Sequence, residues 1–242
     1  LSCSPSHAKG AEFVDREKAI KNYLAYLEEY PKEKYPDFPN RAKVLAKIGL
    51  MLCQYADAER NVQPDYERAR KYLQMAVEAD PDFICHETIH AHTNLGCFGT
   101  TAAAKVRNRA RAYKWLINIT DEQIRESIER EERYRKATMG RGELPRSEIP
   151  VENPVLEKER LAYLERRNAV LDRFRRDRID HEVKTLRKVI TRVAETEKVN
   201  LVHEAMISPD RGASLRYLVQ ELQGSPVGEL ARERLRQLES GS

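Results

Sequence analysis

The segment from Asn153 to Val199 contains no glycine, and its one proline is Pro154 in the first turn. Glu, Arg, Lys, Leu and Ala, which favour helices, fill most of it. A single helix here has roughly 45 residues and spans roughly 68 Å at 1.5 Å per residue. Such a helix is not stable alone in water. It must therefore lie along the rest of the chain, fold back on the helix before it, or pair with another molecule.

The apolar residues of this segment follow one another at spacings of three and four, which is typical of a coiled-coil seam. The pattern shifts once, around Arg178. We expect homo- or hetero-oligomerisation through this helix. The seam positions are Leu156, Leu161, Leu164, Leu171, Phe174, Ile179, Val183, Leu186, Val189, Ile190 and Val193.

The composition predicts an all-α fold throughout. Charged residues make up 34% of the 242 residues, and no apolar run alternates as a strand would. The net charge is +4, with both signs interspersed, which indicates solvated helix faces more than a nucleic-acid surface. One basic stripe, Arg107, Arg111 and Lys114 beside Trp115, leaves nucleic acid open as a less favoured partner.

Helical periodicity and breakers divide the chain into five parts. Residues 1–12 are expected to be a flexible tether. Residues 13–119 hold five helices, near 13–30, 40–58, 66–79, 84–98 and 101–119. Residues 120–152 hold a charged helix, opened by the Thr120–Gln123 capping box, and a linker. The long helix occupies 153–200. Residues 201–242 form a short helical hairpin, with Ser208-Pro209 and Ser225-Pro226 as helix starts.

Residues in the first half follow the spacing of a repeat built from paired helices. One helix reads Tyr66-x-x-Ala69-x-x-x-Leu73-x-x-Ala76-x-x-x-Asp80-Pro81, in which small alanines let a neighbour approach and Pro81 ends the unit. Two other segments have the pattern of the first helix of such a pair. They are Leu45-x-x-Ile48-Gly49 and Ala91-His92-Thr93-Asn94-Leu95-Gly96. Both glycines stand where a neighbouring helix leaves no room for a Cβ.

These patterns resemble tetratricopeptide repeats. The spacing from Gly49 to Ala69 exceeds that of a 34-residue repeat by about 8 residues, so the repeats are degenerate. The resemblance implies antiparallel helix hairpins whose first helices line a concave, protein-binding surface.

Helix 84–98 contains the literal HExxH motif His86-Glu87-x-x-His90. Histidines four apart on a helix share a face and can hold zinc, with the glutamate activating water. The longer form of the motif fails, since Thr93 and Gly96 stand where Gly and His are required. The alternative prediction is therefore a zinc-dependent hydrolase or a metal-binding protein, with His86, His90 and His92 as metal ligands and, in the hydrolase, Glu87 as the catalytic residue. The main prediction has no cofactor and no catalytic residue.

The four cysteines lack metal or disulfide-framework spacing. Cys53, Cys85 and Cys97 are expected to be small buried residues, with a disulfide between two of them as the alternative. Leu1-Ser2-Cys3-Ser4 is similar to the remnant of a bacterial lipobox. That similarity predicts a lipid on Cys3 as the only membrane attachment, and a periplasmic, membrane-tethered location.

The sequence therefore predicts a non-catalytic scaffold that binds another protein, alone or as a subunit of a larger assembly. The expected contact residues are polar or aromatic groups on first helices of the repeats. They are Lys47, Gln54, Tyr55, His92 and Asn94.

Overall fold

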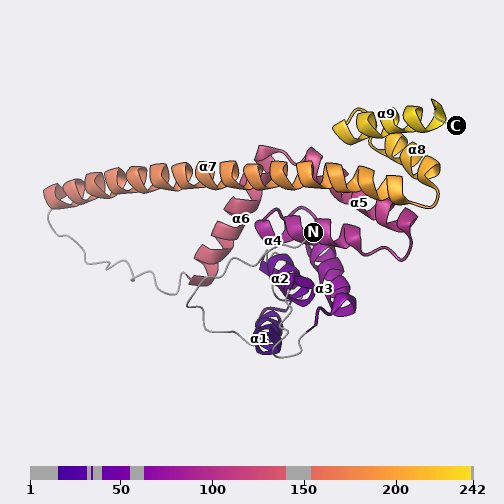
Figure 1. Cartoon of the computed structure of the whole chain (residues 1–242). Coiled ribbons are helices and arrows are strands. Elements are labelled where there is room, and N and C mark those ends of the chain that lie inside the picture. Colours follow the sequence, from indigo (N-terminus) through magenta and orange to yellow (C-terminus); the bar gives the residue numbers. More distant parts are fainter. Residues whose placement is uncertain (1–15, 32–33, 35–39, 55–62, 140–153, 241–242) are drawn as a thin grey trace, which may run out of the picture.

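The computed structural model describes residues 16–31, 34, 40–54, 63–139 and 154–240 (Figure 1). Every regular element within these residues is a helix, which confirms the all-α prediction. The helices are α1 (Arg16–Glu29), α2 (Asn40–Gln54), α3 (Tyr66–Ala79), α4 (His86–Cys97), α5 (Ala102–Asn118), α6 (Asp121–Met139), α7 (Pro154–Ile207), α8 (Arg211–Glu221) and α9 (Pro226–Ser240).

Helices α2 to α5 form two successive hairpins. Helix α2 packs on α3, α4 packs on α5, and α4 also rests on both helices of the first hairpin. Helix α1 covers the outer side through Ile20 and Leu27. The first half is thus built from packed helix pairs, as predicted.

Both hairpins close at a glycine. A Cβ on Gly49 of α2 would lie 2.6 Å from the Cγ of Leu73 and 3.0 Å from its backbone nitrogen on α3. A Cβ on Gly96 of α4 would lie 3.1 Å from the Cα of Arg109 on α5. The close approach expected at these two glycines is therefore present, and it recurs from one hairpin to the next.

Several helix ends follow from local chemistry. The backbone N–H of Gln123 donates to Oγ1 of Thr120 (3.2 Å), and the N–H of Thr120 donates to the Gln123 amide oxygen (2.9 Å), which is the predicted capping box. Helix α3 ends at Ala79, directly before Asp80-Pro81. The backbone N–H of Gly228 donates to Oγ of Ser225 (3.1 Å), so Ser225 starts α9 as expected.

Two boundaries at the end of the long helix differ from the prediction. Helix α7 has 54 residues and continues past Val199 to Ile207, because Leu201, Val202 and Ala205 are buried against α5, α8 and α9. Helix α8 is capped by Asp210, whose side chain accepts from the N–H of Ala213 (2.9 Å), and not by Ser208. The Ser208 hydroxyl instead accepts a hydrogen bond from that of Ser214 (3.0 Å).

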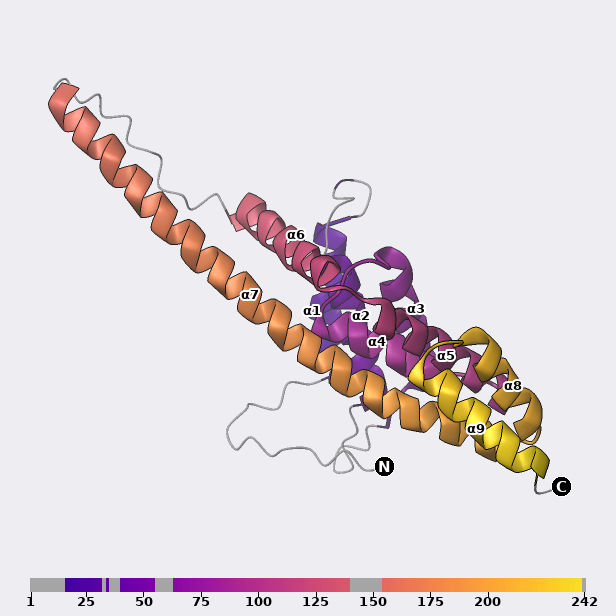
Figure 2. The ribbon, with the colours of Figure 1, turned by 90° about the horizontal axis from the view of Figure 1, so that it is seen from above.

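Helix α7 runs along the whole molecule and holds its parts together (Figures 1 and 2). Its middle packs on α5 and α6, and its last turns pack on the α8–α9 hairpin. The central apolar cluster consists of Ile84, Ile89, Leu116, Ile119, Ile124, Ile128, Ile179, Val183 and Ile190.

The glycine crossings give the first testable prediction. We expect Gly49→Ala to lower the free energy of unfolding by about 1–3 kcal/mol, since its methyl group would press into the fully buried Leu73. Gly212→Ala is the matched control. Its Cβ meets only the mobile end of Arg216 at 3.4 Å, so stability should hold or rise slightly. Urea unfolding followed by circular dichroism measures both. Equal effects at the two positions would contradict a close crossing at Gly49.

Candidate functional site

Hydrogen bonds fix the start of helix α4, and the position of this start determines the direction of its histidine side chains. The N–H of Cys85 donates to Oγ1 of Thr88 (2.9 Å), and that hydroxyl donates to the carbonyl of Phe83 (2.8 Å). The N–H of Ile84 donates to the Ser127 hydroxyl on α6 (3.1 Å). The start of α4 is therefore tied to both its own first turn and α6.

This geometry places the two histidines of the HExxH motif together but directs its glutamate to a different partner. The rings of His86 and His90 lie side by side, with centroids 4.5 Å apart, and His86 is exposed. The Glu87 carboxylate instead forms an ion pair with Lys47 on α2 (3.4 Å). Partial burial favours a raised pKa for Glu87, but its own backbone N–H and the nearby Lys43 and Lys47 bring that pKa below the ordinary value.

Within the described ranges, no group of three His, Cys, Asp or Glu residues stands close enough to hold a metal ion. The predicted third ligand, His92, faces away from His86 and His90 and stacks on Trp115. A metal centre on α4 would thus have two histidine ligands from this region and a glutamate already paired with lysine.

The predicted contact residues fall on two sides of α4. Lys47 and Asn94 lie on one side, where the Asn94 amide donates to the carbonyl of His90 (2.8 Å) and its oxygen lies 3.9 Å from Sγ of Cys53. His92 lies on the other. Tyr55, Cys3 and the side chain of Gln54 are outside the described residues, so those predictions, including the lipid anchor, stay predictions.

The Asn94 side of α4 opens into a groove of about 540 Å³. Tyr66 and Phe98 form its aromatic part, with ring centroids 6.2 Å apart. Its other lining residues are Cys53, Glu67, Arg70, Asn94, Cys97, Gly99 and Thr100.

Among the described residues, Cys53, Cys85 and Cys97 are free thiols, and Cys85 is the one that is buried. The prediction that Cys97 is buried is wrong: its side chain is exposed, and its sulfur lies 3.2 Å from a guanidinium nitrogen of Arg109. Arg109 approaches because Gly96 lets α5 come close to the end of α4.

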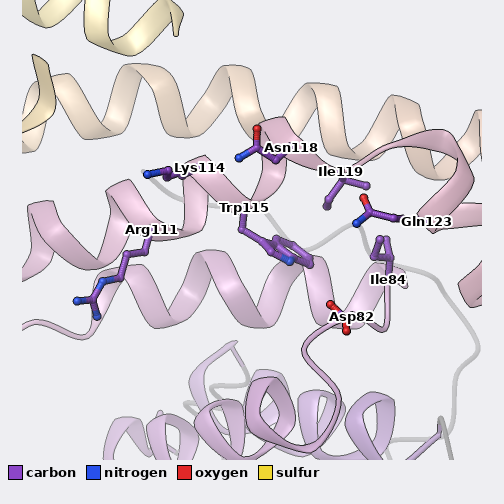
Figure 3. Close-up of a pocket in the computed structure, with 8 residues that line it drawn as sticks. All are labelled: Asp82, Ile84, Arg111, Lys114, Trp115, Asn118, Ile119 and Gln123. Atoms are coloured by element: carbon purple, nitrogen blue, oxygen red, sulfur yellow. The ribbon is translucent and has the colours of Figure 1, made fainter. Parts of the chain in front are cut away.

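The His92 side of α4 borders a second groove, of about 390 Å³ (Figure 3). We call it the Trp115 groove. Figure 3 shows the ring of Trp115, the only tryptophan in the chain, reaching from α5 toward α4. The lining residues are Asp82, Ile84, Arg111, Lys114, Trp115, Asn118, Ile119 and Gln123.

The Trp115 ring that lines the groove stacks on His92 of α4. The His92 and Trp115 rings are 3.7 Å apart between centroids and 16° from parallel. Burial lowers the pKa of His92 to about 4, so its imidazole is neutral at pH 7. The stack therefore acts as an uncharged surface, with Ile84 and Ile119 beside it.

A basic wall adjoins Trp115, since Arg111 and Lys114 lie on the same helix and line the same groove. Arg111 is exposed, and Lys114 pairs with Glu221 near the end of α8 (2.8 Å). Burial and Glu221 raise the pKa of Tyr217 on α8, while Arg111, Arg107 and Lys114 act to lower it. The predicted basic stripe is thus a single face, and it runs from the Trp115 groove toward α8.

Sequence reasoning found Trp115, Arg111 and Lys114 but missed the rest of the groove. Asp82 and Ile84 belong to the segment between α3 and α4, and Gln123 had been assigned to helix capping alone. No local pattern marks these residues as neighbours of Trp115, because they come from two segments that are separate from α5.

No family model, curated protein or solved structure matches the chain. None of the described helices is both long enough and apolar enough to cross a membrane.

The half-buried His92 predicts a pH dependence of stability. Its pKa is about 4 when folded and about 6.5 when unfolded, so the unfolded chain binds more protons between these values. Stability should fall as pH is lowered from about 6.5 to about 4. In the His92→Gln variant, we expect the decrease in the free energy of unfolding on acidification to be smaller by on the order of 2 kcal/mol. Urea unfolding at neutral and acidic pH measures this difference.

The exposed His181 provides the control for this experiment. His181→Gln should keep the pH dependence of the wild-type protein. An unchanged pH dependence in His92→Gln would show that His92 does not stay neutral in the folded state.

The HExxH motif gives a prediction about zinc. Catalytic zinc takes three protein ligands, and the described part of the chain brings two histidines together. We expect metal analysis of protein dialysed against zinc to find no stoichiometric metal. Zinc bound one-to-one and lost in His86→Ala/His90→Ala would overturn this expectation and support the hydrolase alternative.

Proposed function

We propose that this protein is a non-catalytic scaffold that binds a segment of another protein. The observation that carries the proposal is the Trp115 groove, in which basic residues lie beside an uncharged aromatic and aliphatic surface. Tryptophan and arginine are the residues that most often dominate the energy of protein interfaces. A groove of this kind has anchoring groups without a reactive group.

The tetratricopeptide-like interpretation supports the same proposal. Two successive hairpins repeat the same crossing, with Gly49 and Gly96 in equivalent places. The first helices of these hairpins, α2 and α4, carry Lys47, Glu87 and Asn94 on one side. In this proposal, residues 13–119 are degenerate repeats, and α4 presents a binding groove on each of its sides.

The chemistry of the Trp115 groove selects an acidic partner segment. Arg111 and Lys114 would pair with carboxylates, while an apolar side chain would rest on Trp115 and Ile119. The depressed pKa of His92 keeps the stack neutral and therefore suited to an apolar contact. Asp82 and Asn118 provide acceptors for backbone N–H groups of an extended segment.

Partner capture with matched charge reversals tests the proposal. The wild-type chain, Arg111→Glu and Arg192→Glu are used to isolate binding proteins from the native source, with quantification by mass spectrometry. Both arginines are exposed, so neither change should alter the circular dichroism spectrum. We expect a protein whose affinity falls about tenfold, or about 1.4 kcal/mol, with Arg111→Glu alone.

The single tryptophan then reports on the groove directly. An acidic segment of the captured protein, added as a peptide, should shift the Trp115 emission to shorter wavelength as the ring leaves water. The proposal fails if no captured protein depends on Arg111, or if the material lost with Arg111→Glu is nucleic acid.

A further inference from the structure

The N-terminal part of α7 extends beyond the other helices. We call residues 158–174 the distal arm; in Figure 2 its ribbon continues past the end of α6. Its large apolar side chains are mostly in water: Leu161 is 52% exposed, Leu171 51% and Phe174 68%. A lone helix of this length is only marginally stable, so such a surface is expected to be covered when the protein works.

The apolar face of the distal arm continues a face that is already an interface. Leu161, Leu164 and Leu171 lie on the same side of α7 as the seam that begins at Ile179. Ile179 and Val183 are buried against the apolar cluster that includes α6. The arm therefore exposes the part of a helix-packing seam that lies beyond the reach of α6.

Helix α6 shows which chemistry fits this seam. It places Ile124 and Ile128 against the apolar positions of α7. It also buries a carboxylate, because Glu132 is only 4% exposed and is paired with both Arg175 (2.8 Å) and Arg178. A helix that covers α7 thus offers aliphatic residues flanked by carboxylates.

A second ion pair of the same polarity lies farther along the seam. Arg187 of α7 donates to the carboxylate of Asp121 on α6 at 2.6 Å. One pair has the reverse polarity, since Arg125 of α6 binds Asp180 of α7 (2.6 Å). Among the described residues, Glu132 of α6 is nevertheless the only acidic residue that is buried in the interface between α6 and α7.

The distal arm offers the same kinds of group, and no other described helix packs along it. Arg167 is exposed and stands beside Leu164 and Leu171 on one side of the helix. The arm as a whole is basic. Its basic residues Lys158, Arg160, Arg166, Arg167 and Arg173 outnumber its acidic residues Glu159, Glu165 and Asp172.

We propose that the distal arm is a docking surface for an acidic amphipathic helix of another protein, which continues the layer of α6 along α7. The aliphatic side chains of that helix pack on Leu161, Leu164 and Leu171, and its carboxylates pair with Arg167. Two copies of the arm carry the same excess of positive charge, which disfavours pairing of the arm with itself. The surface is separate from the Trp115 groove.

Site-specific photocross-linking in the full chain tests this proposal. A photoreactive amino acid replaces Leu171 in one variant and Val199 in another. Val199 is the control because it is 65% exposed on the same helix but lies outside the arm. The cross-linked peptide is identified by mass spectrometry in material from the native source.

The expected product forms at Leu171 and not at Val199, and joins the arm to a segment of another protein. That segment must have apolar residues at helical spacing and more acidic than basic residues. Cross-links mainly to a second copy of this chain, to residues 140–153 of the same chain, or to a segment without acidic excess would overturn the proposal. So would a yield at Leu171 no higher than at Val199.

Charge reversal separates this proposal from the proposed function. In the Leu171 cross-linking variant, Arg167→Glu should reduce the yield about fivefold or more, since it replaces attraction by repulsion. Arg192→Glu, a reversal on the same helix outside the arm, should leave the yield unchanged. Arg111→Glu should also leave it unchanged, because the Trp115 groove is a different surface. If Arg167→Glu has no effect, the arm does not select an acidic helix.

Discussion

Ile179, Val183 and Ile190 of α7 lie against Ile124 and Ile128 of α6 and against residues of α4 and α5. The other parts of the structure depend on this packing. Helix α7 has 54 residues and gains most of its stability from packing of its apolar face, as helices in proteins generally do. Helix α7 in turn connects the helix hairpins of the first half to the α8–α9 hairpin. Glu197 reinforces this role, because it is 7% exposed and pairs with Arg109 of α5 at 3.0 Å.

The position of α4 links this framework to the candidate binding surfaces. Gly96 lets α5 lie close, and α5 then brings Trp115 onto His92. The segment before α4 contributes Asp82 and Ile84 to the same groove. The neutral imidazole is a consequence of burial rather than of a charged partner. The Trp115 groove is therefore a product of helix packing, and its basic wall reaches α8 through the Lys114–Glu221 pair.

Much of the fold could be predicted because its signals are local. The Thr120–Gln123 capping box, the stop at Asp80-Pro81 and the close contact at Gly49 each depend on residues within a few turns of one another or on the absence of a Cβ. The end of α7 could not be predicted in this way. No residue near Val199 terminates the helix, and burial of Leu201 and Ala205 against other helices extends it. The exposure of Cys97, the last residue of α4, could not be predicted from helical periodicity either.

The sequence by itself determined that the chain is helical, that glycines mark two close crossings, and that the long helix needs a covering surface. These conclusions follow from periodicity, caps and breakers, which act between residues close in the chain. Tertiary structure alone decided that Glu87 meets Lys47 and that His92 meets Trp115. It also decided that α7 both packs on α6 and extends past it. Those outcomes depend on the angles at which helices cross, and distant segments set these angles together.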